Sequence, residues 1–344
     1  MNYKDKIKLK ISQMKFKVFA DSIIKDKKSE AKKKQKYAVD KDIEFVIFLP
    51  AADCYFYQYY DLMDYSNVDI NISISNFNLI SPNLNKVLHK NYYNGPINGK
   101  IKYFIFVGQY GRCTKDFRKY LKEKYPKCRI VFVMGDLMKT HGGLSLEEFR
   151  SFSDIVLTYD EGDAIRYGFT SYDGPYTKIH NLDRGLKVSE SDIVFCGYCK
   201  DRVNFLIDLY DKLSGAGLTC DFNIPDLKRE YADARKPLAG GTVQPYLEHL
   251  KRVQKSKCIL DIVQKGADGF DVRVWEAVVY QKKLITNNRR ILSASFYNPR
   301  YISVVDSVDE VDPLWINEKI KIDYMMDDTL MPVKWLEFIV RKLK

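Results

Sequence analysis

The sequence lacks an apolar run long enough to span a bilayer, and its lysine-rich amino terminus has no hydrophobic stretch of the kind found in signal peptides. We therefore expect neither a transmembrane helix nor a signal peptide. The sequence also lacks a G-x-G-x-x-G segment after a strand, which disfavours a nicotinamide-dependent oxidoreductase. The C-x-x-C formed by Cys196 and Cys199 has no second cysteine pair or histidine tract at zinc-like spacing. We expect neither a metal site nor a redox role there.

Length and composition indicate a folded protein of two domains. The 344 residues are too many for one ordinary hydrophobic core, and a content of 46% hydrophobic and 14% aromatic residues is typical of a globular protein. The seven cysteines are an odd number scattered through apolar strands and loops, which suits a reducing cytosol.

Positive charge is concentrated at the amino terminus. The formal net charge is +11, and residues 1–41 hold 14 lysines against 5 acidic residues. Such a chain can bind nucleic acid, an anionic membrane or anionic substrates. A basic amphipathic helix within residues 1–40 is predicted by apolar residues at helical spacing, namely Ile7, Ile11, Met14 and Val18. Two interpretations stay open: a membrane-surface element, or a helix packed on the first domain and followed by a solvated linker.

Strands and helices alternate along the rest of the chain, as in Rossmann-like α/β domains. We place the boundary near residue 185, because the stretch around Gly174-Pro175 has little periodicity. This gives domains at 41–185 and 186–330 and a closing segment at 331–344. Apolar runs predict strands at Ile43–Leu49, Tyr103–Val107, Arg129–Met134, Ile155–Thr158, Ile193–Cys196, Thr219–Ile224, Cys258–Val263, Leu284–Thr286 and Tyr301–Val305. Helices are predicted at Thr114–Lys124 with Thr114 as a cap, Val203–Ser214, Pro245–Ser256, Val272–Tyr280 and Pro332–Leu343. The Asn- and Ser-rich stretch 67–84 predicts only weak strands and turns.

The stretch from Cys258 to Asn288 is a strand, a glycine loop, a helix and a strand, the βαβ unit of an open α/β sheet. In such sheets ligands bind beyond the carboxyl ends of the strands. Arg273 and Glu276 are three residues apart, so they share one face of the helix. An arginine can clamp a phosphate, and a glutamate can accept both hydroxyls of a ribose. The alternative is that both are solvated charges on the helix surface.

A second anion site is indicated at the first strand-to-helix turn of the second domain. Gly197 follows a predicted strand, and Lys200 and Arg202 precede the next helix. Backbone N–H groups, the helix dipole and two cations would all favour an anion at this turn.

The residues from Asp192 to Asn288 resemble the carboxyl-terminal domain of bacterial glycosyltransferases of the GT-B architecture. The resemblance lies in C-I-L-D-I-V-Q, the short glycine loop, the helix with Arg273 and Glu276, and K-K-L-I-T-N-N. It implies an α/β fold of two Rossmann-like domains with a cleft between them, and a final helix that often crosses back to the first domain. It also implies donor binding in the second domain, with Glu276 on the ribose and with Gln264 and the loop up to Gly269 beside it.

Transfer from a nucleotide-diphosphate sugar requires that the leaving diphosphate be stabilised and the acceptor hydroxyl lose its proton. The only D-x-D, Asp40-Lys41-Asp42, precedes a strand rather than following one, so we expect a metal-independent reaction in which Lys200, Arg202 and Arg273 offset the charge. Candidates for the catalytic base follow strands of the first domain: Asp53, Asp136, His141 and Asp160. Inversion and retention both stay open, and a retaining enzyme would not need such a base.

The leading hypothesis is a cytoplasmic hexosyltransferase of capsular polysaccharide or lipopolysaccharide biosynthesis. It would use a UDP-sugar, no other cofactor and a glycan or lipid-linked acceptor, and residues 1–36 would contact the inner face of the cell membrane. The alternative from another class is a basic nucleic-acid-binding protein, although no nucleic-acid motif is present and we do not expect nucleic acid as the main partner. A NAD(P)-dependent oxidoreductase ranks last.

Overall fold

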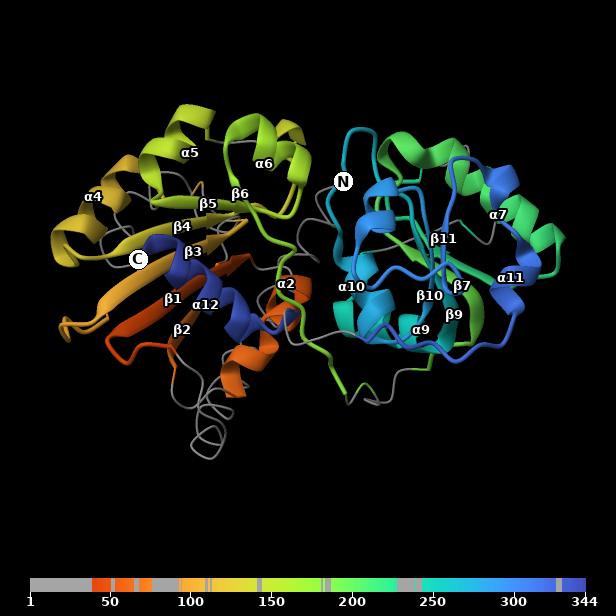
Figure 1. Ribbon diagram of the computed structural model, residues 1–344, viewed down its shortest axis with the longest axis horizontal. Helices are drawn as coiled ribbons and strands as arrows, with labels where there is room; N and C mark the ends of the chain where they lie inside the picture. The colour runs from red at the N-terminus through yellow and green to blue at the C-terminus, as the bar shows by residue number, and fades with distance from the viewer. Residues whose placement is uncertain are drawn as a thin grey trace, which may run out of the picture. The chain divides into compact units, whose positions relative to one another are not determined.

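The computed structural model describes residues 39–50, 53–64, 68–75, 93, 95–108, 111, 113–140, 144–180, 182, 187–227, 238, 243–325 and 330–344. The chain forms two compact units, one of residues 1–177 with 328–344 and one of residues 178–327 (Figure 1). The carboxyl-terminal segment therefore belongs to the same unit as the amino-terminal half. The predicted amphipathic helix within residues 1–40 lies almost wholly outside the described residues.

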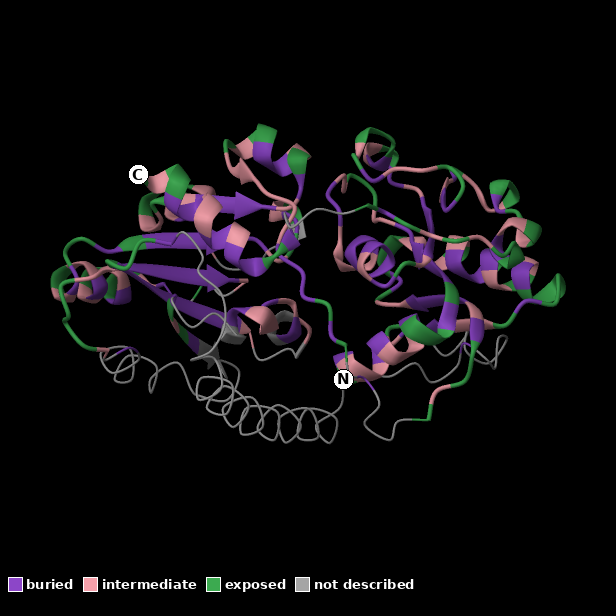
Figure 2. Cartoon of the chain, turned by 60° about the horizontal axis from the view of Figure 1, so that its bottom comes forward, coloured by how far each residue is buried: buried purple, intermediate pink, exposed green. Residues whose placement is uncertain are grey.

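The first unit is built on a sheet whose strand order is β2-β1-β3-β4-β5-β6, and all neighbouring strands are parallel. The strands are β1 Ile43–Pro50, β2 Asp69–Ser75, β3 Ile101–Val107, β4 Arg129–Val133, β5 Ile155–Thr158 and β6 Thr170–Ser171. The helices are α2 Asp53–Gln58, α4 Lys115–Lys124, α5 Leu146–Phe152, α6 Glu161–Tyr167 and α12 Pro332–Leu343. The central strands β1 and β3 are buried along almost their whole length (Figure 2), because helices cover both faces of the sheet (Figure 1), and they are apolar except at Glu44 and Lys102. The predicted cap is confirmed, since Thr114 Oγ1 accepts the Phe117 N–H at 3.2 Å.

The second unit has a parallel sheet in the order β11-β10-β9-β7-β8. Its strands are β7 Ser191–Cys196, β8 Cys220–Asn223, β9 Ser256–Asp261, β10 Lys283–Thr286 and β11 Ile302–Val304. Its helices are α7 Val203–Gly215, α9 Tyr246–Lys255, α10 Val272–Val279 and α11 Pro313–Asn317. The chain winds outward in one direction from β7 and in the other from β9. The carboxyl ends of these two strands, Cys196 and Asp261, therefore mark the switch point at which open α/β sheets bind ligands.

The alternation of side chains along β9 determines what each helix layer contacts. Leu260 joins the buried cluster that includes Leu206 of α7 and Ile316 of α11. Asp261 is the next residue, so its side chain points to the opposite face, where α10 packs on β9. The last residue of a buried strand therefore directs a carboxylate at the first turn of α10.

The α/β fold of two Rossmann-like units agrees with the prediction, and every predicted strand is present. Within the described residues, none of the helices combines the length and the apolar character needed to cross a membrane.

Candidate functional site

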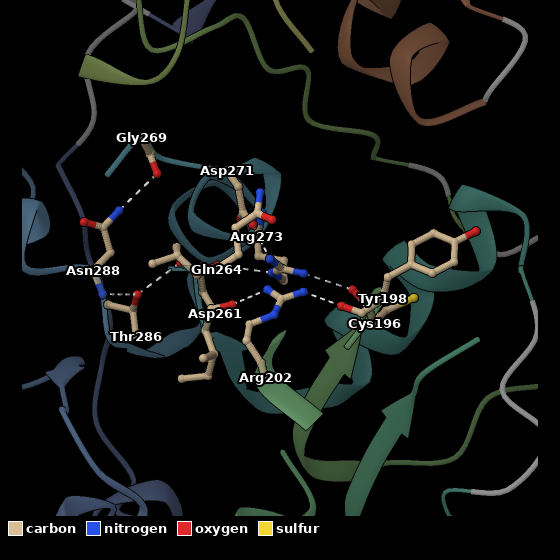
Figure 3. Close-up of polar contacts among 12 residues, drawn as sticks. Cys196, Tyr198, Arg202, Asp261, Gln264, Gly269, Asp271, Arg273, Thr286 and Asn288 are labelled. Carbon is tan, nitrogen blue, oxygen red and sulfur yellow. Dashed lines mark hydrogen bonds and ion pairs between the residues drawn. The ribbon is translucent and has the colours of Figure 1, made fainter. Parts of the chain in front are cut away.

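Arg202 joins the carboxyl ends of the two strands at the switch point (Figure 3). Its Nη1 donates to the Ile262 carbonyl just after β9, and its Nη2 donates to the Tyr198 carbonyl just after β7. Its Nε donates to the Cys199 carbonyl at 3.2 Å. The planar fork of the guanidinium therefore fixes the turn that follows β7 against the end of β9.

Arg273 lies beside Arg202 and is held by two carboxylates and one carbonyl (Figure 3). Its Nε is 3.1 Å from Asp261 Oδ1, its Nη2 pairs with Asp271, and its Nη1 donates to the Cys196 carbonyl at 3.2 Å. The side chain is only 11% exposed. The alternative interpretation of Arg273 as a solvated surface charge is therefore wrong.

Arg273 reaches the end of β7 beside Gly197, where the absence of a side chain leaves room for its guanidinium. A Cβ atom on Gly197 would lie 2.9 Å from Arg273 Nη1, closer than real Cβ contacts come. Both guanidinium groups also lie against the ring of Phe195, with Cζ 5.3 Å from the ring centroid for Arg273 and 5.9 Å for Arg202. Burial, followed by the nearby charge of Arg273, lowers the pKa of Arg202.

Asp261 is fully buried and accepts a hydrogen bond from Thr286 Oγ1 of β10 at 3.0 Å. Burial raises the pKa of Asp261 to about 7, and repulsion from Asp271 adds to this effect while Arg273 opposes it. The centre therefore contains two arginines and two aspartates packed around the ends of β7 and β9.

Glu276 lies one turn further along α10 and is also fully buried, so it is not a solvated surface charge either. Tyr246 Oη donates to Glu276 Oε1 at 2.7 Å, and His249 Nε2 is 2.8 Å from Oε2. Burial lowers the pKa of His249, but the Glu276 carboxylate and the Cys196 side chain outweigh burial and raise it to about 10. The predicted contact of Glu276 with a ribose stays a prediction, and the structure adds that two side chains of α9 already bind this carboxylate.

Lys200 and Gln264 form the more open part of the site. Lys200 is exposed and its Nζ donates to Gln264 Oε1 at 3.4 Å. The backbone N–H groups at this turn are not directed at an outside anion, because Cys199 N–H and Lys200 N–H donate to the Asp226 carboxylate at 2.7 and 3.3 Å. The Gly269 carbonyl accepts from Asn288 Nδ2 at 3.0 Å. All seven predicted donor-site residues lie in the second unit, at or near the carboxyl edge of its sheet.

The candidates for the catalytic base lie in the first unit. Asp160 is the N-cap of α6, where its Oδ1 accepts the Asp163 N–H at 2.8 Å, and it is only 1% exposed. His141 lies outside the described residues, as does the side chain of Asp53, whose backbone begins α2. These assignments stay predictions.

Sequence reasoning missed the partners of the predicted cations. Asp261 is part of the motif C-I-L-D-I-V-Q, but no function was predicted for it. Asp271 occupies the N-cap position of α10, two residues before Arg273. The position of Asp271 was a usable signal, because aspartate is a preferred N-cap. Tyr246 and His249 lie about 30 residues before Glu276, and no spacing rule connects them to it.

Metal ligation has no candidate among the residues that the structure describes, since no three His, Cys, Asp or Glu side chains gather there. The D-x-D sequence lies in the turn before β1, where the Asp42 N–H donates to Asp40 Oδ1 at 3.1 Å. All seven cysteines are free thiols.

No family model matches the chain, and no curated protein matches it. Among solved structures, it is similar to an alpha-glucosyltransferase in complex with UDP and a 13-mer DNA containing a central A:G mismatch. The TM-score is 0.53 at 13% sequence identity, and the match covers 86% of this chain and 99% of the other. This likeness concerns the fold, and it agrees with the GT-B arrangement of two Rossmann-like α/β domains.

Proposed function

We propose that the chain is a glycosyltransferase that takes a sugar from a UDP-sugar. The observation that carries the proposal is the pair of guanidinium groups, Arg202 and Arg273, fixed at the switch point of a Rossmann-like sheet with the exposed Lys200 beside them. Nucleotides bind at this position of such sheets. The UDP bound to the structurally similar alpha-glucosyltransferase supports the same donor class.

In this proposal the diphosphate lies over the turn after β7, and the cations offset the charge that develops on the leaving group. Lys200 and Gln264 reach the donor directly, whereas Arg202 and Arg273 lie beneath them and hold the turn after β7 in place. Contact of Glu276 with the ribose hydroxyls is part of this proposal. Tyr246 and His249 leave lone pairs on both carboxylate oxygens, but the side chain is fully buried, so the contact requires the residues that cover Glu276 to move aside when the donor binds. No metal or further cofactor is part of this proposal.

The acceptor that we propose first is a glycan or lipid-linked saccharide of cell-surface polysaccharide biosynthesis, as the resemblance of residues 192–288 implies. The enzyme would work in the cytoplasm, and the basic residues 1–36 would bring it to an anionic membrane face. This segment lies outside the described residues.

DNA is a second candidate acceptor, and two observations favour it. The structurally similar alpha-glucosyltransferase is bound to DNA, and this chain carries a net charge of +11. Neutralising phosphates with lysines supplies affinity that falls steeply with salt. Transfer to DNA would leave the donor site unchanged and would replace the membrane by a nucleic acid as the partner of the basic segment.

The test of the donor site is a thermal-shift and calorimetric screen with UDP-, GDP-, CMP- and dTDP-sugars, with NAD(P) as a control. We expect UDP-sugars alone to stabilise the protein, by about 2.7 kcal/mol at a hundred times the dissociation constant. Lys200→Ala should weaken UDP-sugar binding. The matched control Lys255→Ala should not, because this half-exposed lysine lies just before β9, at the opposite edge of the same sheet. Stabilisation by none of the nucleotide sugars would refute the proposal.

The acceptor is tested separately with a radiolabelled UDP-sugar. The protein is incubated with duplex DNA or with lipid-linked oligosaccharide in vesicles that contain anionic lipid. Transfer to the lipid-linked saccharide alone supports the first acceptor, and transfer to DNA alone supports the second. Release of UDP without transfer to either substrate would contradict both.

A further inference from the structure

The charges at the proposed diphosphate site nearly cancel. Arg202 and Arg273 contribute two positive charges, and Asp261 and Asp271 contribute two negative charges within the same group. The carbonyls that hold Arg202 are dipoles without net charge. A diphosphate would therefore meet a centre that is close to neutral, with Lys200 as an added cation. Its binding would be favoured if one of the two carboxylates lost its negative charge.

Of the two carboxylates, Asp261 is the one whose charged form is more destabilised by its surroundings. It is fully buried, whereas the side chain of Asp271 is 26% exposed and can be hydrated. Asp271 is also needed as an acceptor, because its Oδ1 caps α10 by accepting the Arg273 N–H at 2.8 Å. Burial and the charge of Asp271 already raise the pKa of Asp261 to about 7, so protonating Asp261 near neutral pH costs little free energy.

The groups that face Asp261 come from three directions. Asp271 and Arg273 belong to α10 and its cap, Arg202 belongs to the turn after β7, and Thr286 belongs to β10. Glu276 affects this group indirectly, because its negative charge raises the pKa of Arg273. An added anion would reinforce the effect of Asp271 on Asp261, since both are negative charges that favour the neutral acid.

The surroundings of Asp261 can accommodate the proton. Thr286 Oγ1 donates to Asp261 Oδ2 at 3.0 Å and accepts the Asn288 N–H at 3.1 Å. A hydroxyl oxygen has two acceptor sites, so it can also accept a hydrogen bond from a protonated Oδ2 once its own hydrogen has rotated away. Asp261 Oδ1 remains free to accept from Arg273 Nε. Protonation therefore needs no movement of Arg273.

We infer that Asp261 takes up one proton from solvent when the diphosphate of the donor binds, so that donor affinity and protonation of Asp261 are linked. This inference rests on the proposed function. No covalent bond changes except the new O–H bond on Oδ2, and the proton comes from the buffer. The protonated form binds the anion more tightly, so donor affinity falls as pH rises, by at most about tenfold per pH unit for one linked proton.

The experiment is isothermal titration of the full chain with UDP-glucose at about pH 7.5, chosen to lie just above the raised pKa of Asp261. UDP-glucose is used because its doubly substituted diphosphate does not titrate near neutral pH. The titration is repeated in PIPES, HEPES and Tris, whose protonation enthalpies differ and which place no phosphate in competition with the donor. The slope of observed enthalpy against buffer protonation enthalpy gives the number of protons exchanged. We expect a net uptake by the wild type that is greater than zero and at most one proton.

Two variants identify the group that is protonated. Asp261→Asn keeps the shape and an acceptor for Arg273, and it should abolish both the slope and the pH dependence of affinity. Asp271→Asn removes the like charge that raises the pKa of Asp261, and it should move the linkage to lower pH without abolishing it. A zero slope in the wild type, or an unchanged slope in Asp261→Asn, would overturn the inference while leaving the donor site intact. Absence of UDP-glucose binding would instead refute the proposed function, and the inference with it.

Discussion

Nε2 of His249 on α9 lies 2.8 Å from Oε2 of Glu276 on α10, and both side chains are buried. Tyr246 binds the other oxygen of the same carboxylate at 2.7 Å. The Glu276 carboxylate therefore links the two helices that cover one face of the second sheet. Tyr246 and His249 therefore fix the orientation of the Glu276 side chain before any donor binds.

His249→Ala should destabilise the second unit by about 3–5 kcal/mol near neutral pH, because it leaves a buried carboxylate without its charged partner. Urea denaturation followed by tryptophan fluorescence measures the change in the free energy of unfolding. The control is Lys255→Ala, which removes a partner from the exposed pair with Glu190 and should cost less than about 1 kcal/mol.

The cost of His249→Ala should depend on pH. The pKa of His249 is raised to about 10 in the folded protein, above a value of about 6.5 in the unfolded chain. The stability that the charged imidazole contributes is therefore fully present below the unfolded pKa and is lost as pH rises through the folded pKa. The difference in unfolding free energy between wild type and variant should shrink from about pH 6.5 to about pH 10. A difference that stays constant over this range would mean that His249 is neutral in the folded state.

The strands of the fold could be predicted because buried strands appear in the sequence as short runs of apolar residues. A parallel strand covered on both faces is apolar at nearly every position, and Ile43–Pro50 and Ile101–Val107 follow this pattern except at Glu44 and Lys102, which pair with each other. The stretch 67–84 alternates polar and apolar residues, and this pattern predicts weak strands and turns. It contains β2, Asp69–Ser75, an edge strand parallel to β1, and an edge strand can leave one face exposed.

The site was predictable in its position but not in its pairings. The glycine turn, the cations near it and the helix after β9 follow from local patterns. The contact of Arg273 with Asp261 depends on how α10 packs against the sheet. The contact of Glu276 with His249 joins two helices that are separated in the sequence by a strand. Pairings of this kind are determined by packing in three dimensions, which spacing along one chain does not encode.

Lys102→Met should destabilise the first unit by about 3–5 kcal/mol, because Glu44 would be left buried without its cation. The Lys102 side chain is 1% exposed, pairs with Glu44 and lies over the ring of Tyr125 at 5.3 Å. The double variant Glu44→Gln with Lys102→Met should recover much of this loss of stability, because it removes both charges. Tyr93 Oη donates to Glu44 at 2.8 Å, and the amide oxygen introduced by Glu44→Gln can still accept this hydrogen bond. Chemical denaturation of both variants measures the effect. Equal losses in the single and double variants would show that packing, rather than the charge, carries the cost.

Gly197→Ala should cost about 1–3 kcal/mol of stability and weaken UDP-sugar binding, because the new methyl group would displace Arg273 from the end of β7. The matched control is Gly215→Ala at the end of α7, where a Cβ would meet no atom within 4 Å. Alanine favours a helix, so the control should be neutral or more stable by at most about 1 kcal/mol. Thermal denaturation with and without UDP-glucose measures both effects. Normal donor binding by Gly197→Ala would mean that the position of Arg273 is not important for the donor.

Arg202→Lys tests whether the guanidinium acts through its shape or only through its charge. Lysine keeps the charge, but its compact ammonium cannot bind the carbonyls of Tyr198, Cys199 and Ile262 in the way that the planar fork does. We expect a loss of about 1–3 kcal/mol, the cost of a buried acceptor left unsatisfied, and a smaller thermal shift with UDP-glucose. Arg252→Lys is the matched control, since Arg252 forms a partly exposed pair with Asp221 at 2.6 Å and a lysine there should cost less than about 1 kcal/mol. If both variants behave alike and both bind UDP-glucose as the wild type does, charge alone is sufficient at position 202, and the junction between β7 and β9 does not depend on the guanidinium.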